Sequence, residues 1–137
     1  MGQSPAFGNQ VLTIYIIDLA PEARSRIAAA LATEPLDVQT FAGAEEFLEA
    51  LCATWSGCVI GPSDLPGMGM RALIEELQRR QPALKVIVIG RDAEVSTAVE
   101  MVRAGAVEFI EAPFSDRRLR TVVRRVIGHN AGAAALC

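Results

Sequence analysis

The chain has 137 residues, 51% of them hydrophobic, and a formal net charge of −3 at pH 7. This composition excludes a disordered chain, predicts one domain that folds alone, and gives no overall attraction to nucleic acid. The cysteines Cys52, Cys58 and Cys137 form no CxxC pair, so we expect no disulfide framework and a reducing cytoplasm, with Cys52 and Cys58 as small core residues. The sequence shows neither a signal peptide nor an apolar span of about 18 residues, so we expect no membrane contact.

Apolar strand patterns alternate with helical patterns along the chain. Strands are predicted at residues 11–18, 36–41, 57–61, 84–90 and 106–110. Each predicted helix has an apolar stripe: Ala23, Ile27 and Leu31; Phe47, Leu48, Leu51, Cys52 and Trp55; Met70, Leu73, Ile74 and Leu77; Val95, Ala98, Val99 and Val102; Leu119, Val122, Val123, Val126 and Ile127. Gly105 is expected to adopt the left-handed backbone conformation that ends the fourth helix. Ser115 is expected to cap the start of the fifth helix, and Gly128 to end it.

Short alternating strands and helices require parallel strands joined by right-handed crossovers. The predicted fold is therefore a doubly wound α/β sandwich of five β-α units, with a five-stranded parallel sheet. We divide the chain into a flexible leader (1–10), one domain (11–128) and a tail or linker remnant (129–137). In such sheets the functional crevice lies at the carboxyl ends of the strands. The loops after Asp18, Gly61, Gly90 and Ile110 are therefore where a site is expected.

Four stretches together carry a family resemblance. They are YIIDLAPEAR at the first strand, TFAGAEEFLEAL, the DLPGM turn after the third strand, and AVEMVRAGAVEFIEAPF around the fifth. The order of elements and these stretches resemble a CheY-like receiver domain of bacterial two-component signalling, most closely the FixJ-like group. The resemblance covers residues 11–128 and implies a flavodoxin-like fold.

The positions that carry chemistry in that family are altered here. An acid pair that holds magnesium maps to Asp18 and Leu19, and the phosphoacceptor aspartate maps to Pro62, which offers neither a nucleophile nor a backbone N–H. The threonine or serine that ends the fourth strand in that family maps to Gly90, and the lysine that precedes a proline after the fifth strand maps to Ala112. Phosphoryl transfer needs a carboxylate nucleophile, a hard dication and a cation for the product. The resemblance therefore implies a degenerate receiver, or pseudo-receiver, that is not an enzyme and has no cofactor; Asp18 alone is a weak metal candidate.

Alternatives remain open in this crevice. A shifted register would present Asp64 as a displaced phosphoacceptor. Arg91 could pair with Asp92 or with Asp18, or could hold a small anion and make the crevice a small-anion sensor. We expect Asp18 to cap the following loop by accepting backbone N–H bonds. The resemblance also implies a cis peptide bond before Pro113.

The resemblance implies a protein-binding face made by the fourth helix, fifth strand and fifth helix. Its candidate residues are Glu100, Arg103, Glu108, Phe109, Arg117, Arg118, Arg120, Arg124 and Arg125. No aromatic residues interleave with the arginines, so we expect no direct nucleic-acid contact by this domain. The expected partner is a protein, either a second copy in a homodimer or a signalling or output protein, in signal transduction or transcription regulation.

Overall fold

The computed structural model describes residues 12–91 and 94–136, with side chains described as far as Gly128. The leader predicted at residues 1–10 lies outside the described residues. Strands and helices alternate as follows: β1 (Leu12–Ile17), α1 (Pro21–Ala30), β2 (Leu36–Phe41), α2 (Ala44–Ala50), β3 (Gly57–Pro62), α3 (Met70–Arg80), β4 (Leu84–Gly90), α4 (Val95–Ala104), β5 (Glu108–Glu111) and α5 (Asp116–Leu136). Among the described residues, no helix is both apolar enough and long enough to cross a bilayer.

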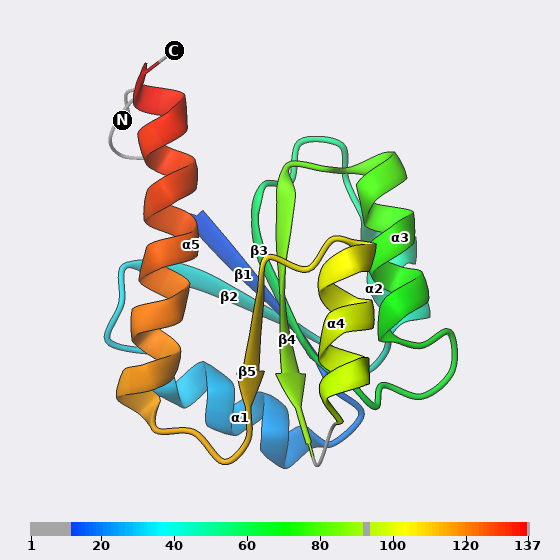
Figure 1. Ribbon diagram of the computed structural model, residues 1–137. Coiled ribbons are helices and arrows are strands. Elements are labelled where there is room, and N and C mark those ends of the chain that lie inside the picture. Colours follow the sequence, from blue (N-terminus) through cyan, green and yellow to red (C-terminus); the bar gives the residue numbers. More distant parts are fainter. Residues whose placement is uncertain (1–11, 92–93, 137) are drawn as a thin grey trace.

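The strands form one parallel sheet in the order β2-β1-β3-β4-β5. Helices α1 and α5 cover one face of the sheet, and α2, α3 and α4 cover the other (Figure 1). This arrangement confirms the predicted doubly wound fold. Because all strands run the same way, their carboxyl ends meet at one edge of the sheet, the lower edge in Figure 1.

Alternating strand side chains build two separate cores. On β1, Ile14 and Ile16 face α1 and α5, whereas Tyr15 and Ile17 face α2 and α3. These side chains are at most 2% exposed, and burying each isoleucine contributes about 1.5–3 kcal/mol. Cys58 belongs to the α1 and α5 core, as predicted, and burial raises the pKa of its thiol well above the usual value.

The chain after α2 differs from the prediction. The helix ends at Ala50 instead of continuing to Trp55, because Trp55 stacks on Tyr15 with ring centroids 4.6 Å apart. Phe47 joins the same aromatic cluster, at 5.7 Å from Tyr15. Cys52 consequently lies in the loop and is exposed, so its assignment to the core was wrong.

The ends of the last two helices give one confirmation and one correction. Gly105 ends α4 with φ of 134°, as predicted. Gly128 does not end α5, which continues to Leu136. The four alanines that follow Gly128 have a high helix propensity, which helps to offset the two interior glycines, Gly128 and Gly132. The region 129–136 is therefore helical, where a tail was expected.

Helix α4 turns its apolar stripe outward. Val95, Val99 and Val102 are 81%, 42% and 51% exposed, whereas Met101 is buried against the α2 and α3 side of the sheet. At 100° per residue, Met101 and Ala104 lie roughly opposite the stripe, and both pack on the core. The predicted helix is confirmed, but its valine stripe forms a surface instead of core.

Candidate functional site

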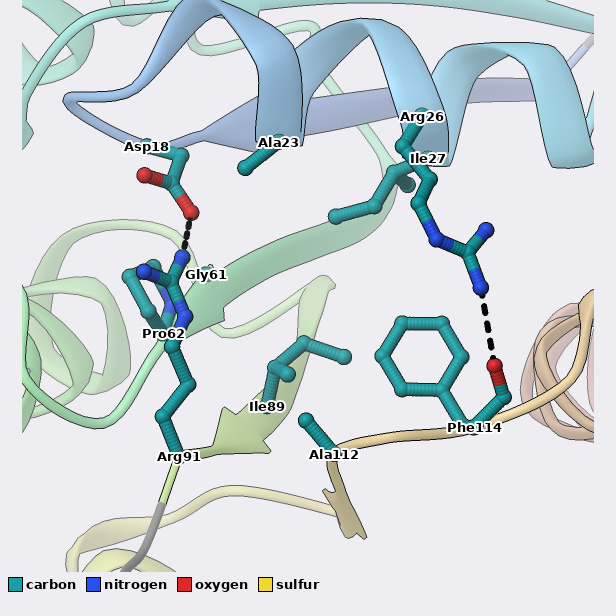
Figure 2. A pocket seen from close by; sticks show the side chains of 10 residues that line it. All are labelled: Asp18, Ala23, Arg26, Ile27, Gly61, Pro62, Ile89, Arg91, Ala112 and Phe114. Carbon is teal, nitrogen blue, oxygen red and sulfur yellow. Dashed lines mark hydrogen bonds and ion pairs between the residues drawn. The ribbon is translucent and has the colours of Figure 1, made fainter.

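A pocket lies at the carboxyl ends of the strands, at the predicted edge of the sheet. Its lining includes three of the positions that the family resemblance singled out, Asp18, Pro62 and Ala112. Leu19 is 63% exposed and is not part of the lining. Gly90 is also outside the lining, although Ile89 and Arg91 on either side of it contribute (Figure 2). The fold therefore brings together three of the five positions that the sequence singled out.

Asp18 is the buried carboxylate of this pocket. It is 3% exposed, and its Oδ1 accepts a hydrogen bond of 3.0 Å from the backbone N–H of Ala20. This bond confirms the expectation that Asp18 caps the turn after β1. Arg24 donates to the backbone oxygen of Asp18 and so holds the same turn from α1.

Arg91 supplies the positive charge of the pocket. Its Nη2 donates to Oδ2 of Asp18, across the carboxyl ends of β1 and β4 (Figure 2). The Arg91 side chain is 38% exposed and the Asp18 side chain 4%, so the ion pair is only partly open to water. Of the pairings considered from the sequence, the structure shows the one with Asp18; Asp92 lies outside the described residues.

The donor set does not fit a magnesium ion. Magnesium requires octahedral oxygen ligands and is usually held by carboxylates or phosphates. Among the described residues, no group of three or more Asp, Glu, His or Cys side chains could hold a metal. Both oxygens of Asp18 already accept hydrogen bonds, one from Ala20 and one from Arg91. A guanidinium thus lies where a metal would have to approach this carboxylate.

The loop after β3 carries an acid, Asp64, that lies outside the lining of the pocket. Pro62 is the last residue of β3 and is buried, and the next N–H, of Ser63, donates to the Ile89 oxygen at 2.7 Å. Asp64 is exposed and is not part of the pocket lining. Farther along the loop, the Met68 N–H donates to Oε2 of Glu45 in α2 at 2.8 Å. The loop is therefore held at both ends, with Asp64 outside.

Arg26 and Phe114 complete the pocket on the side away from Asp18. Arg26 donates to Asp116 at 2.8 Å and to the Phe114 backbone oxygen at 2.9 Å. Its guanidinium also lies over the Phe114 ring, 5.4 Å from the centroid. Sequence reasoning missed both residues, because Arg26 reaches this loop only through the packing of α1 beside α5. The bond between Ala112 and Pro113 is cis, as predicted.

The candidate interface residues do not all share one face. Arg120 donates to the Ala30 oxygen at 3.1 Å, and Arg124 forms two hydrogen bonds with Glu34, of 2.8 and 2.6 Å. These two arginines therefore attach α5 to the end of α1 and the following turn, so their assignment to the β5 face is corrected. The contact with Arg124 lowers the pKa of Glu34.

Other interface candidates do lie around α4 and β5. Glu108 pairs with Arg125 at 2.8 Å, and Glu100 lies 4.0 Å from Arg71 of α3. Phe109 is partly buried and packs against the α2, α3 and α4 core. Arg103 lines a shallow hollow together with Ala98, Val99 and Val102 on the outer face of α4.

Comparisons with known proteins agree on one family. The model of the response regulator receiver domain matches residues 14–124. The transcriptional regulatory protein FixJ of Bradyrhizobium diazoefficiens is 31% identical over 121 residues, which cover 88% of this chain and 59% of FixJ. The crystal structure of full-length FixJ from B. japonicum superposes with a TM-score of 0.81 at 31% identity, covering 90% of this chain and 61% of that one. NtrX from Brucella abortus in complex with ADP gives a TM-score of 0.84 at 27% identity, covering 93% and 29%. This chain thus spans less than two thirds of the length of these relatives.

Proposed function

Because this chain belongs to the family of response regulator receiver domains, we propose that it is a phosphorylation-independent member, a pseudo-receiver that acts by binding proteins. The observation that carries the proposal is the ion pair between Arg91 and Asp18. It neutralises the remaining acid of the pocket with a cation from the protein itself. With proline at position 62 and alanine at position 112, the described residues that line the pocket offer no carboxylate at the acceptor position and no lysine for a phosphoryl group.

A magnesium and beryllofluoride titration followed by two-dimensional amide NMR tests this proposal. Beryllofluoride mimics a phosphoryl group on an aspartate, so a working receiver shows shifts around its acceptor. We expect the amides of Asp18, Gly61 and Asp64 to stay unmoved at millimolar concentrations of both reagents. Saturable shifts centred on Asp64 would instead establish a displaced phosphoacceptor and overturn the proposal.

The position of Asp64 weighs against that alternative. Its side chain is exposed beyond the end of β3, whereas Asp18 and Arg91 lie in the pocket. An aspartyl phosphate on Asp64 would form in water, away from these two groups. Replacing Asp64 with asparagine should therefore leave partner binding unchanged.

We propose the outer face of α4 as the interface with a second copy of the chain. Val95, Val99 and Val102 form an exposed apolar stripe, and Val107 before β5 is also 44% exposed. Contiguous apolar surface of this kind marks protein interaction sites. Arg103 and Glu100 on the same helix carry opposite charges, so a two-fold arrangement can place acid against base.

Sedimentation equilibrium tests this interface. Val99→Glu should shift a dimer toward monomer, because it places a charge in the apolar stripe. Ala29→Glu is the matched control, since Ala29 is exposed on α1 on the other face of the sheet. A wild-type chain that stays monomeric at about 100 μM would contradict self-association and leave a different signalling or output protein as the partner.

The proposal extends to the setting of the domain. FixJ is a transcriptional regulatory protein, so we place this chain in cytoplasmic control of transcription. Arg120, Arg124 and Arg125 have partners within the domain. This intramolecular pairing supports the expectation that the domain itself does not contact nucleic acid.

A second candidate function is the sensing of a small anion. The pocket that contains Asp18 has arginines at two positions, Arg26 and Arg91, and a volume of about 130 Å³. A ligand there would contact β3, β4 and the loop after β5 together.

A further inference from the structure

The pocket at the carboxyl ends of the strands combines an apolar floor with a charged rim. Its apolar lining includes the side chains of Ile27, Pro62, Ile89 and Phe114 (Figure 2). Its volume of about 130 Å³ is close to that of an engineered apolar cavity of about 150 Å³ that holds benzene. A ligand with a body of four to six carbon atoms therefore suits its size.

The two arginines at the rim differ in what they can offer a ligand. Arg26 uses both of its terminal nitrogens, one on Asp116 and one on the Phe114 oxygen. Arg91 uses Nη2 on Asp18, and among the described residues this is the one bond of its guanidinium. An arginine carries five N–H donors in a planar fork that suits a carboxylate. Arg91 can thus hold Asp18 and a bound carboxylate at once.

We propose that this pocket binds a short-chain monocarboxylate, with its apolar body against Ile27, Ile89 and Phe114 and its carboxylate on Arg91. Inorganic phosphate is disfavoured, because it would leave the apolar floor uncovered and in contact with water. A neutral molecule is disfavoured, because the N–H groups of Arg91 that do not bind Asp18 form stronger hydrogen bonds with a carboxylate than with an uncharged acceptor. The inference deepens the second candidate function, since it names the ligand class of the same site.

Titration with isovalerate, followed by amide NMR, tests the inference. We expect saturable shifts at Gly61, Ile89, Ala112 and Phe114, with a dissociation constant in the millimolar range or below. Isovaleramide has the same body without the charge and should bind at least tenfold more weakly. Phosphate at equal concentration should give no saturable shifts at these amides.

Variants separate the roles of shape and charge. Ala23→Leu fills the pocket from α1 and should weaken isovalerate binding at least tenfold, whereas Ala29→Leu, on the exposed side of α1, should not. The double variant Asp18→Asn with Arg91→Gln removes both charges and should make isovalerate and isovaleramide bind equally.

Three outcomes would overturn the inference. They are the absence of saturable shifts up to about 50 mM isovalerate, equal binding of the amide to the wild-type chain, and unchanged binding by Ala23→Leu. None of these bears on phosphorylation, which the beryllofluoride titration reports through Asp64. The two proposals can therefore fail separately.

Discussion

The ion pair between Arg91 and Asp18 should be a measurable part of the stability of the domain. Removing one partner of a fully buried pair lowers stability by about 3–5 kcal/mol, whereas an exposed pair contributes about 0–1 kcal/mol. The Asp18 side chain is 4% exposed and the Arg91 side chain 38%, so water screens the arginine end of the pair. We expect Arg91→Gln to lower the free energy of unfolding by about 2 kcal/mol and Tm by about 8 °C.

A double-mutant cycle isolates this contribution. Asp18→Asn keeps an oxygen for the Ala20 N–H, so in that background Arg91→Gln should change stability by less than about 0.5 kcal/mol. Urea unfolding can be followed through Trp55, the one tryptophan, which stacks on Tyr15. If Arg91→Gln changes the free energy of unfolding equally in both backgrounds, to within about 0.3 kcal/mol, Arg91 and Asp18 do not interact. That result would refute the claim that Arg91 neutralises Asp18.

Two further predictions concern parts of the fold outside the pocket. Gly57 has φ of 120°, and a Cβ there would lie 2.3 Å from the Thr13 oxygen, so Gly57→Ala should lower the free energy of unfolding by at least about 2 kcal/mol. Gly128→Ala, in open space on α5, should instead raise the free energy of unfolding by about 0.5–1 kcal/mol. Urea unfolding that shows the same change for Gly57→Ala and Gly128→Ala would contradict both predictions. The pair between Glu34 and Arg124 lowers the pKa of Glu34. The stability that this pair contributes to the folded chain is therefore present above the usual pKa of glutamate and is lost as the pH falls through the lowered pKa. Arg124→Gln should therefore be less stable than the wild type at pH 7 and equally stable near pH 2, and a difference that persists at pH 2 would refute the assignment.

The places of Pro62 and Ala112 at the carboxyl ends of the strands could be predicted from the sequence. The DLPGM turn places Pro62 at the end of β3, and the AVEFIEAPF stretch places Ala112 after β5. Both assignments depend on spacing within a short segment, which local backbone geometry preserves. The prediction that the carboxyl ends of the strands lie at one edge of the sheet followed from the parallel arrangement, because every parallel strand ends on the same side.

The outward face of α4 could not be read in this way. Its valines have the same helical spacing as a buried stripe, and periodicity alone identifies a face but not which side of the helix the core covers. The packing of Met101 and Ala104 on the sheet decided it. Likewise, α2 was predicted too long, because the stacking of Trp55 on Tyr15 is a contact between distant segments.

The sequence by itself determined the order of strands and helices, the two-sided sheet and the residue types at the carboxyl ends of the strands, among them Pro62 and Ala112. These features depend on residue type and local spacing. Only the tertiary structure decided which acid each arginine binds: Arg91 reaches Asp18 across 73 positions, and Arg124 reaches Glu34 across 90. A long, flexible guanidinium can reach several acids, and the packing of α1, β4 and α5 selects one of them. The ion pair in the pocket is therefore a product of the fold, while the residue types that line the pocket are a property of the sequence.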